Sequence, residues 1–269
     1  MGAHVRHALA TLLIATSLTL GSGVAMAAPK PHYPPPPPPP PPAFSWTGTY
    51  VGANLGYSWG SAHSTYNGGA GFTGFGVPNV LLDGQHVDGV IGGIQLGYNW
   101  QASNMWVYGL ETDFQGSGER GNGNFGANYF FDFPAGFSAL NASVTTKILW
   151  FGTVRARAGY LITPDVLIYA TGGLAYGSIK SAGNFTDTNI PASWAFGGTS
   201  TQVGWTVGGG VEGAVWNSSA WTWKVEYLYV DYGTLNFSGV TGDSSFPTYT
   251  WSTHVTDNIV RGGVNYKFW

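Results

Sequence analysis

Several ionisable residues fall on alternate positions of the sequence, a spacing that places side chains on one face of a strand. Glu111 and Asp113 lie two residues apart, as do Arg155 and Arg157. Neighbouring carboxylates in a cleft can perform general acid–base catalysis. A nearly equal number of cations in the same small space would instead keep them ionised as structural ion pairs, and we favour this interpretation. The set is Glu111, Asp113, Arg155, Arg157, Glu212, Lys224, Glu226, Arg261 and Lys267.

Other residues that could carry chemistry lack the partners that it requires. His63, His86 and His254 fall in predicted loops with no carboxylate at a useful spacing, and no Ser or His nucleophile system falls on a predicted strand. The chain has no cysteine, so it has neither disulfides nor thiolate metal ligands. Glycine runs such as Gly208–Gly210 precede no helix whose N-terminus could bind phosphate. We predict no catalytic, cofactor-binding or metal-binding residues and no enzymatic activity; a metal or hemin role for the histidines is a minor alternative.

The ionisable residues need strands to hold them on one face, and the sequence supplies eight. Each alternates apolar and polar side chains over about ten positions, as does the wall of a membrane β-barrel. Only 9% of residues are charged, against about 25% in soluble domains. We predict an all-β fold, an eight-stranded antiparallel up-and-down transmembrane β-barrel. Its predicted strands are Tyr50–Trp59, Val90–Gln101, Trp106–Gln115, Lys147–Tyr160, Val166–Gly177, Gln202–Val215, Trp221–Tyr229 and Ile259–Phe268.

The connections between these strands alternate in length, which gives the barrel a direction. Short turns are predicted at Ala102–Met105, Leu161–Asp165 and Trp216–Ala220. Long connections, rich in Gly, Asn, Ser and Thr, are predicted at Ser61–Gly89, Gly116–Thr146, Ser178–Thr201 and Tyr232–Thr256. Bacterial outer-membrane barrels have short periplasmic turns and longer extracellular loops. On the alternation, Ile148 should face lipid, and so should Asp231 unless the span ends there or a bulge intervenes.

Aromatic side chains gather near the ends of the predicted strands. Amphipathic rings favour the headgroup level on both sides of a membrane. A soluble β-sandwich also uses aromatic residues, but most of its outer strand faces would be polar, whereas the predicted outer faces here are apolar. The predicted girdle residues are Trp59, Trp100, Trp106, Trp150, Tyr160, Trp216, Trp221 and Trp223.

The N-terminal region has the features of an exported protein. A weakly basic start, the apolar segment Leu9–Leu20 and small residues at Ala25 and Ala27 fit a signal peptide cleaved after Ala27. The apolar segment is short for a membrane-spanning helix. Nine prolines, Pro34–Pro42, favour a polyproline II helix, which would make a stiff periplasmic spacer, passive or in contact with the cell wall. The predicted divisions are a signal peptide at 1–27, a proline-rich tether at 28–45 and a barrel at 46–269.

Six segments carry a resemblance to a known family. They are Trp46–Tyr57, Trp150–Arg157, Tyr169–Gly177, Val203–Gly208, Glu226–Asp231 and Val264–Phe268. In this order they resemble the 25/31-kDa outer-membrane protein family of alphaproteobacteria, "porin family" β-barrels of OmpA-like size. The resemblance implies an abundant eight-stranded surface barrel that acts as a structural envelope protein and surface antigen, with no catalytic residues. It also implies two alternatives, because some members are reported to bind hemin or to act as weak porins.

The C-terminus has the pattern expected of this class, with one departure. Such barrels usually end on an aromatic residue, most often Phe, which the outer-membrane insertion machinery reads together with the alternating apolar residues before it. Val264, Tyr266 and Phe268 supply that pattern, and Trp269 follows it. We expect Phe268 to be the matched position, with Trp269 either a harmless extra residue or the terminal residue that is read.

The number of strands and the inward charges together predict the function class. An eight-stranded barrel is just wide enough for side chains to fill, so inward charges of both signs predict an ion-paired, filled lumen. We expect a structural, surface-exposed protein of the outer membrane of a Gram-negative bacterium, in contact with lipid and lipopolysaccharide. No basic stripe suggests a nucleic-acid partner. The alternatives are a narrow porin and a hemin- or glycan-binding protein, the latter suggested by the predicted loop aromatics Tyr66, Phe72, Phe75, Tyr129, Phe130, Phe131, Trp194 and Tyr249.

Overall fold

The computed structural model describes residues 44–68, 80–132, 135–187, 193–216, 218–239 and 249–268. The predicted signal peptide with Ala25 and Ala27, the proline run and Trp269 lie outside these residues. In the described part of the chain every long regular element is a β-strand, and no helix there is long and apolar enough to cross a membrane. The strands are β1 (Gly48–Gly68), β2 (Val80–Gln101), β3 (Trp106–Ser117), β4 (Arg120–Asp132), β5 (Ala135–Thr163), β6 (Val166–Asp187), β7 (Ser193–Ala214), β8 (Trp221–Gly239) and β9 (Tyr249–Lys267).

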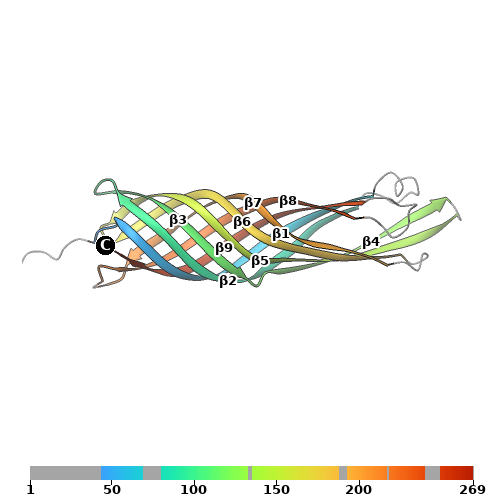
Figure 1. Ribbon diagram of the computed structural model, residues 1–269, viewed down its shortest axis with the longest axis horizontal. Helices are drawn as coiled ribbons and strands as arrows, with labels where there is room; N and C mark the ends of the chain where they lie inside the picture. Colours follow the sequence, from blue (N-terminus) through green and yellow to red (C-terminus); the bar gives the residue numbers. More distant parts are fainter. Residues whose placement is uncertain are drawn as a thin grey trace, which may run out of the picture. The chain divides into compact units, whose positions relative to one another are not determined.

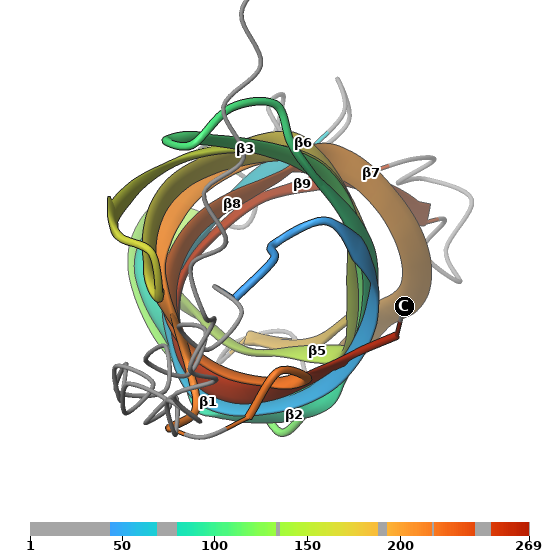
Figure 2. The same ribbon diagram turned by 90° about the vertical axis from the view of Figure 1, so that its left-hand side faces the viewer.

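The strands form one closed antiparallel ring (Figures 1 and 2). The first strand pairs with β2 on one side and with β9 on the other, which closes the ring of described strands. Strand β4 continues the line of β3 after a break at Gly118 and Glu119, and both pair with β5. The nine segments therefore occupy eight positions around the ring, which confirms the predicted eight-stranded barrel.

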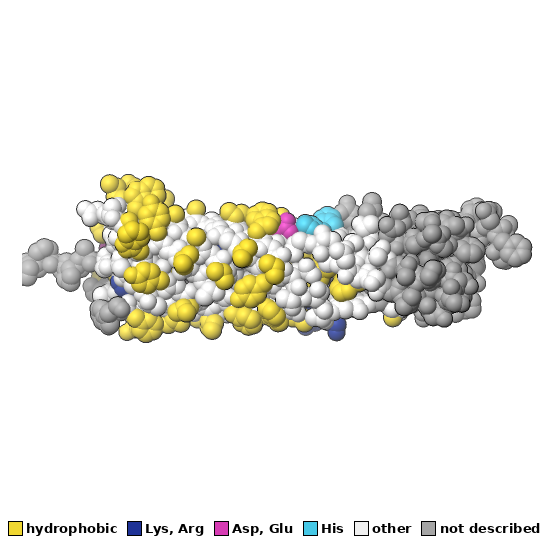
Figure 3. All heavy atoms as spheres, turned by 45° about the horizontal axis from the view of Figure 1, so that its top comes forward, with side chains coloured by type: hydrophobic (Ala, Val, Ile, Leu, Met, Phe, Trp, Pro, Cys, Tyr) yellow, Lys and Arg dark blue, Asp and Glu magenta, His cyan; other side chains and the backbone are white. Residues whose placement is uncertain are grey.

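The wall follows the predicted alternation of apolar and polar side chains. Leu55, Ile94 and Val203 point outward and are more than 60% exposed, whereas the intervening polar residues Asn54 and Gln95 are buried inside. The outward apolar side chains form a band around one part of the wall, and polar side chains follow beyond it (Figure 3). An apolar belt around a closed ring of strands is the surface that a membrane barrel presents to lipid.

The strands extend well beyond the membrane band, so the predicted long loops are shorter than expected. Much of each predicted loop is strand, and the β4–β5 hairpin projects furthest (Figure 1). In these extensions the pattern is inverted: Ala62, Val87 and Ile179 are buried inside, while Ser, Thr, Asn and His face outward. The sequence pattern missed these strands because it identified a strand by apolar residues on its lipid-facing side, and here the outward residues are polar. The barrel thus continues outside the membrane as a water-exposed wall, and its interior holds apolar side chains together with buried polar ones such as Gln85, Thr146 and Thr253.

Two bulges change the side-chain phase. The pairing of β5 with β6 shifts between Ile148 and Trp150, so Leu149 is exposed and Ile148 is buried inside. The prediction that Ile148 faces lipid is therefore wrong, because one extra residue in a strand reverses the alternation. A second shift follows Asp231, whose Oδ1 accepts a 2.7 Å hydrogen bond from the amide of Gly233. Gly233 has φ +73°, a conformation that favours glycine. The bulge predicted at Asp231 is confirmed.

Candidate functional site in the barrel lumen

Antiparallel pairing places opposite charges next to each other inside the barrel. Glu111 on β3 is directly opposite Arg155 on β5, and Glu226 on β8 is directly opposite Arg261 on β9. Glu212 on β7 stands opposite Lys224 on β8. Side chains on directly opposite residues are close enough to interact. Register alone therefore brings six of the predicted residues into pairs.

Arg155 is the centre of this network. Its guanidinium contacts three carboxylates, at 2.5 Å from Glu111, 3.0 Å from Asp113 and 2.9 Å from Glu226. The contact with Glu226 crosses the lumen, because β6 and β7 separate β5 from β8 in the ring. Lys224 likewise reaches from β8 to Glu111 on β3, at 2.9 Å. These side chains span the interior.

Arg261 and Arg157 complete the network. Arg261 contacts Glu226 at 2.6 Å and Asp113 at 2.8 Å. Arg157 lies 2.6 Å from Glu212 and 3.7 Å from Glu111, and its guanidinium lies over Tyr169, 4.0 Å from the ring centre. Four carboxylates thus face four cations, and all eight side chains are buried.

Neutral side chains extend the network to the remaining wall. Tyr50 donates to Glu111 at 2.7 Å and receives a hydrogen bond from Arg157 at 3.0 Å. A chain of amides then runs around the lumen: Asn54 donates to Gln95, which donates to Asn265, which donates to Glu212. Tyr50 and this chain were not predicted as site residues, although their inward positions follow from the same alternation that identified the charges.

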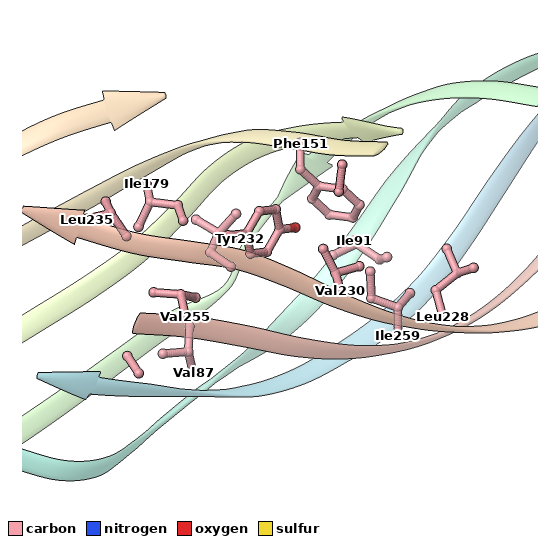
Figure 4. Close-up of a cluster of buried hydrophobic side chains, with 13 residues drawn as sticks. Val87, Ile91, Phe151, Ile179, Leu228, Val230, Tyr232, Leu235, Val255 and Ile259 are labelled. Carbon is pink, nitrogen blue, oxygen red and sulfur yellow. The ribbon is translucent and has the colours of Figure 1, made fainter. Parts of the chain in front are cut away.

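An apolar layer closes the lumen on the extracellular side of the charges (Figure 4). On β8 the residues that follow Glu226 inward are Leu228, Val230 and Tyr232, and each is fully buried. They pack together with buried side chains from the other strands. The layer consists of Ala62, Val87, Ile91, Ile148, Phe151, Ala175, Ile179, Leu228, Val230, Tyr232, Leu235, Val255 and Ile259.

A second apolar layer closes the periplasmic mouth. The chain before β1 turns inward across the opening (Figure 2), and Trp46 there is only 1% exposed. Its Nε1 donates to the carbonyl of Pro164 at 3.0 Å. The ring packs with Phe44 and with Val107, Leu161, Leu167 and Tyr169 of the wall. Residues 44–47 therefore form a hatch over the lumen.

Lys267 is the one predicted network residue that lies elsewhere. Its ammonium group lies 4.6 Å from the centre of the Phe44 ring and donates to the carbonyl of Ser45. No carboxylate among the described residues forms an ion pair with it. The prediction that Lys267 joins the lumen network is wrong, because β9 reaches the periplasmic mouth before this residue and places it beside the hatch.

The predicted girdle residues lie on the outer wall. Trp100, Trp106, Tyr160, Trp221 and Trp223 surround the periplasmic end, and contacts such as the 5.4 Å ring distance between Trp106 and Tyr160 link them. Trp59 and Trp150 lie near the opposite border of the apolar band. Trp216 instead projects from a turn and is 89% exposed. In the predicted insertion signal, Val264 and Phe268 face outward, and Tyr266 is half-buried beside Phe268.

A buried acidic pair nearer the extracellular end was not predicted. Glu119 fell in a predicted loop and Asp257 between a predicted loop and the last predicted strand, yet both are almost fully buried inside the extended barrel. Ser117 donates to Glu119 at 2.9 Å, and Ser58 donates to Asp257. Both residues point into the barrel, and the sequence could have shown this only if the full length of the strands had been known.

His63, His86 and His254 lie on the outer wall beyond the membrane band. His63 on β1 is directly opposite His254 on β9, and His254 is 3.6 Å from the carboxylate of Asp231. Among the described residues no group of three or more His, Cys, Asp or Glu could hold a metal ion. The side chains of the aromatic residues predicted to bind a loop ligand lie outside those described.

A closed antiparallel ring with an apolar belt, aromatic borders and a charged interior defines an outer-membrane β-barrel. The family model described as "Outer membrane protein beta-barrel domain" matches residues 16–268. The chain belongs to this family, together with the 25/31-kDa outer-membrane proteins that the sequence resembles, and its place is the outer membrane.

Relatives share most of the chain. The "31 kDa outer-membrane immunogenic protein" of Brucella melitensis is 42% identical over 230 residues, covering 84% of this chain and 85% of the relative. The "22 kDa outer membrane protein" of Rhizobium leguminosarum bv. viciae is 32% identical over 209 residues, covering 78% and 79%. Among solved structures, the outer-membrane protein OprG of Pseudomonas aeruginosa covers 82% of this chain and 96% of its own, with a TM-score of 0.45 and 12% identity.

Proposed function

We propose that this barrel is closed to solutes and serves as a structural, surface-exposed envelope protein whose working surfaces are its outer wall and extracellular extension. The observation that carries this proposal is the set of ion pairs that cross the lumen, above all Arg155–Glu226 and Lys224–Glu111. An apolar layer lies on each side of them. A hydrated solute would have to break these pairs and displace both layers.

The same geometry argues against catalysis by the lumen carboxylates. Glu111 accepts hydrogen bonds from Arg155, Lys224 and Tyr50, and the other three carboxylates are bonded to cations or hydroxyls. Carboxylates held in this way are ionised structural partners, and the side chains bonded to them occupy the space that a substrate would need. We infer that the protein is not an enzyme.

A liposome-swelling assay tests the closed lumen. We expect liposomes that contain the refolded mature chain to swell in isotonic arabinose no faster than protein-free liposomes. Liposomes with a general porin provide the positive control, and the heat-modifiable gel mobility of the chain confirms folding. Swelling that is faster for arabinose than for a disaccharide would contradict the proposal and support the alternative of a narrow porin.

A further inference from the structure

Three cations stand in one row on the outer wall. Arg120 on β4 is directly opposite Lys147 on β5, and Lys147 is directly opposite Lys180 on β6. Arg120 and Lys180 are exposed and Lys147 is half-buried, while the residues that flank each of them are buried inside. We call these three residues the cationic ladder.

The ladder holds every Lys and Arg of the described outer wall. Of the 10 Lys and Arg residues in the sequence, Arg6 and Lys30 lie outside the described residues. Five others face the lumen or its periplasmic mouth: Arg155, Arg157, Lys224, Arg261 and Lys267. The outer wall is otherwise without Lys or Arg, so its positive charge is concentrated on three adjacent strands at one height.

No described carboxylate forms an ion pair with the ladder. Asp88 on β2 stands opposite Arg120, but its carboxylate accepts a hydrogen bond from Tyr57 and forms no ion pair with Arg120. Like charges on directly opposite residues destabilise a sheet. Two successive like-charged pairs in a chain that has so few charges point to an anion that lies between them.

The height of the ladder identifies the source of that anion. An aromatic row lies just below it on the same side of the barrel: Phe114 and Trp150 have ring centres 5.5 Å apart, and Trp150 and Tyr176 have ring centres 6.3 Å apart. Such rings mark the headgroup level. Lys147 is three residues further out than Trp150, about 10 Å along the strand and roughly 7–8 Å along the membrane normal at the usual strand tilt. This places the ladder among the phosphorylated head groups of the outer leaflet.

We propose that the cationic ladder binds the phosphate groups of a phosphorylated outer-leaflet lipid of the lipid A type. Lysine and arginine form short, charge-assisted hydrogen bonds to phosphate oxygens. Three cations spaced along one rim fit a head group that carries more than one phosphate. This inference rests on the place of the barrel in the outer membrane and is independent of whether the lumen conducts.

Binding of lipid A to the refolded mature chain in detergent micelles, followed by native mass spectrometry, tests the ladder. Each cation near an anionic lipid contributes about fivefold in affinity, so the triple change Arg120→Gln, Lys147→Gln and Lys180→Gln should weaken binding by about 100-fold. Lipid A without its phosphates should bind the parent chain as weakly as intact lipid A binds the triple variant. Inorganic phosphate at the same concentration should not displace lipid A.

Two matched variants separate the ladder from net charge. Adding Thr234→Lys, Asn236→Lys and Ser238→Lys on β8 to the triple variant restores the charge at another part of the wall and should not restore binding. The pair Lys147→Arg and Lys180→Arg keeps the ladder and should bind as the parent does. Without lipid A the triple variant should be at least as resistant to urea as the parent, because repulsion is relieved. Equal lipid A binding by parent and triple variant, or full rescue by the β8 lysines, would overturn the proposal, as would displacement by inorganic phosphate.

Discussion

Replacing Arg155 by methionine is expected to lower the free energy of unfolding by about 3–5 kcal/mol, the usual loss when one partner of a buried ion pair is removed. Arg155 contacts Glu111, Asp113 and Glu226 within the lumen. Without it, four buried carboxylates would face three cations, and the excess negative charge would remain away from water. Equilibrium unfolding in urea, followed by the gel mobility of the folded barrel in detergent, measures the change.

Two further variants test whether the ion-pair network causes that loss of stability. Lys267→Met removes a cation that forms no ion pair with a described carboxylate, so we expect it to cost less than about 1 kcal/mol. Adding Glu226→Gln to Arg155→Met removes a carboxylate as well and should cost less than the sum of the single changes, because the two residues interact. Strictly additive losses, or equal losses for Arg155 and Lys267, would show that Arg155 does not act through the ion-pair network.

Replacing Trp46 by alanine is expected to lower the free energy of unfolding by about 3–5 kcal/mol, the range for removing a buried tryptophan. Trp46 fills the periplasmic mouth, where it packs with Phe44, Leu161 and Leu167. Its removal also leaves the carbonyl of Pro164 without the indole donor. The same urea titration measures the change.

Trp216 provides the matched control for Trp46. It lies in a short turn at the periplasmic end of the barrel, where Trp46 also lies, but it is 89% exposed. Trp216→Ala should therefore change the free energy of unfolding by no more than about 0.5 kcal/mol. A loss at Trp216 as large as that at Trp46 would contradict the hatch as a packed part of the barrel.

The membrane-spanning wall was predictable because its physics is local. Each residue there faces either lipid or lumen, so the two-residue alternation located the strands and assigned eight of the nine predicted charges to one network. Charged residues on the lipid face would be costly, which is why Glu111, Arg155 and Arg261 could be placed inside from sequence alone. A short turn sets the register that pairs Glu212 with Lys224, whereas Glu111–Arg155 and Glu226–Arg261 pair across long connections.

The remaining features depend on contacts between distant residues, which the alternation of apolar and polar residues along the sequence does not reveal. A bulge at Leu149 reversed the phase and moved Ile148 inside. The extracellular extension has polar outward residues, so its strands looked like loops, and Glu119 and Asp257 were hidden with them. Trp46 precedes β1, and nothing in its local sequence shows that the chain turns into the lumen. The cationic ladder appeared only when three distant segments were placed in register.

The most direct test of a closed lumen is the single-channel conductance of the refolded mature chain in planar lipid bilayers, with insertion confirmed by flotation of the same protein in liposomes. Ion pairs between two apolar layers predict no discrete current steps at low or high salt. They also predict no steps from Arg155→Ala with Arg157→Ala alone, because both apolar layers persist in that variant. Stable, uniform current steps from the parent chain would contradict the account and assign the barrel to the narrow porins.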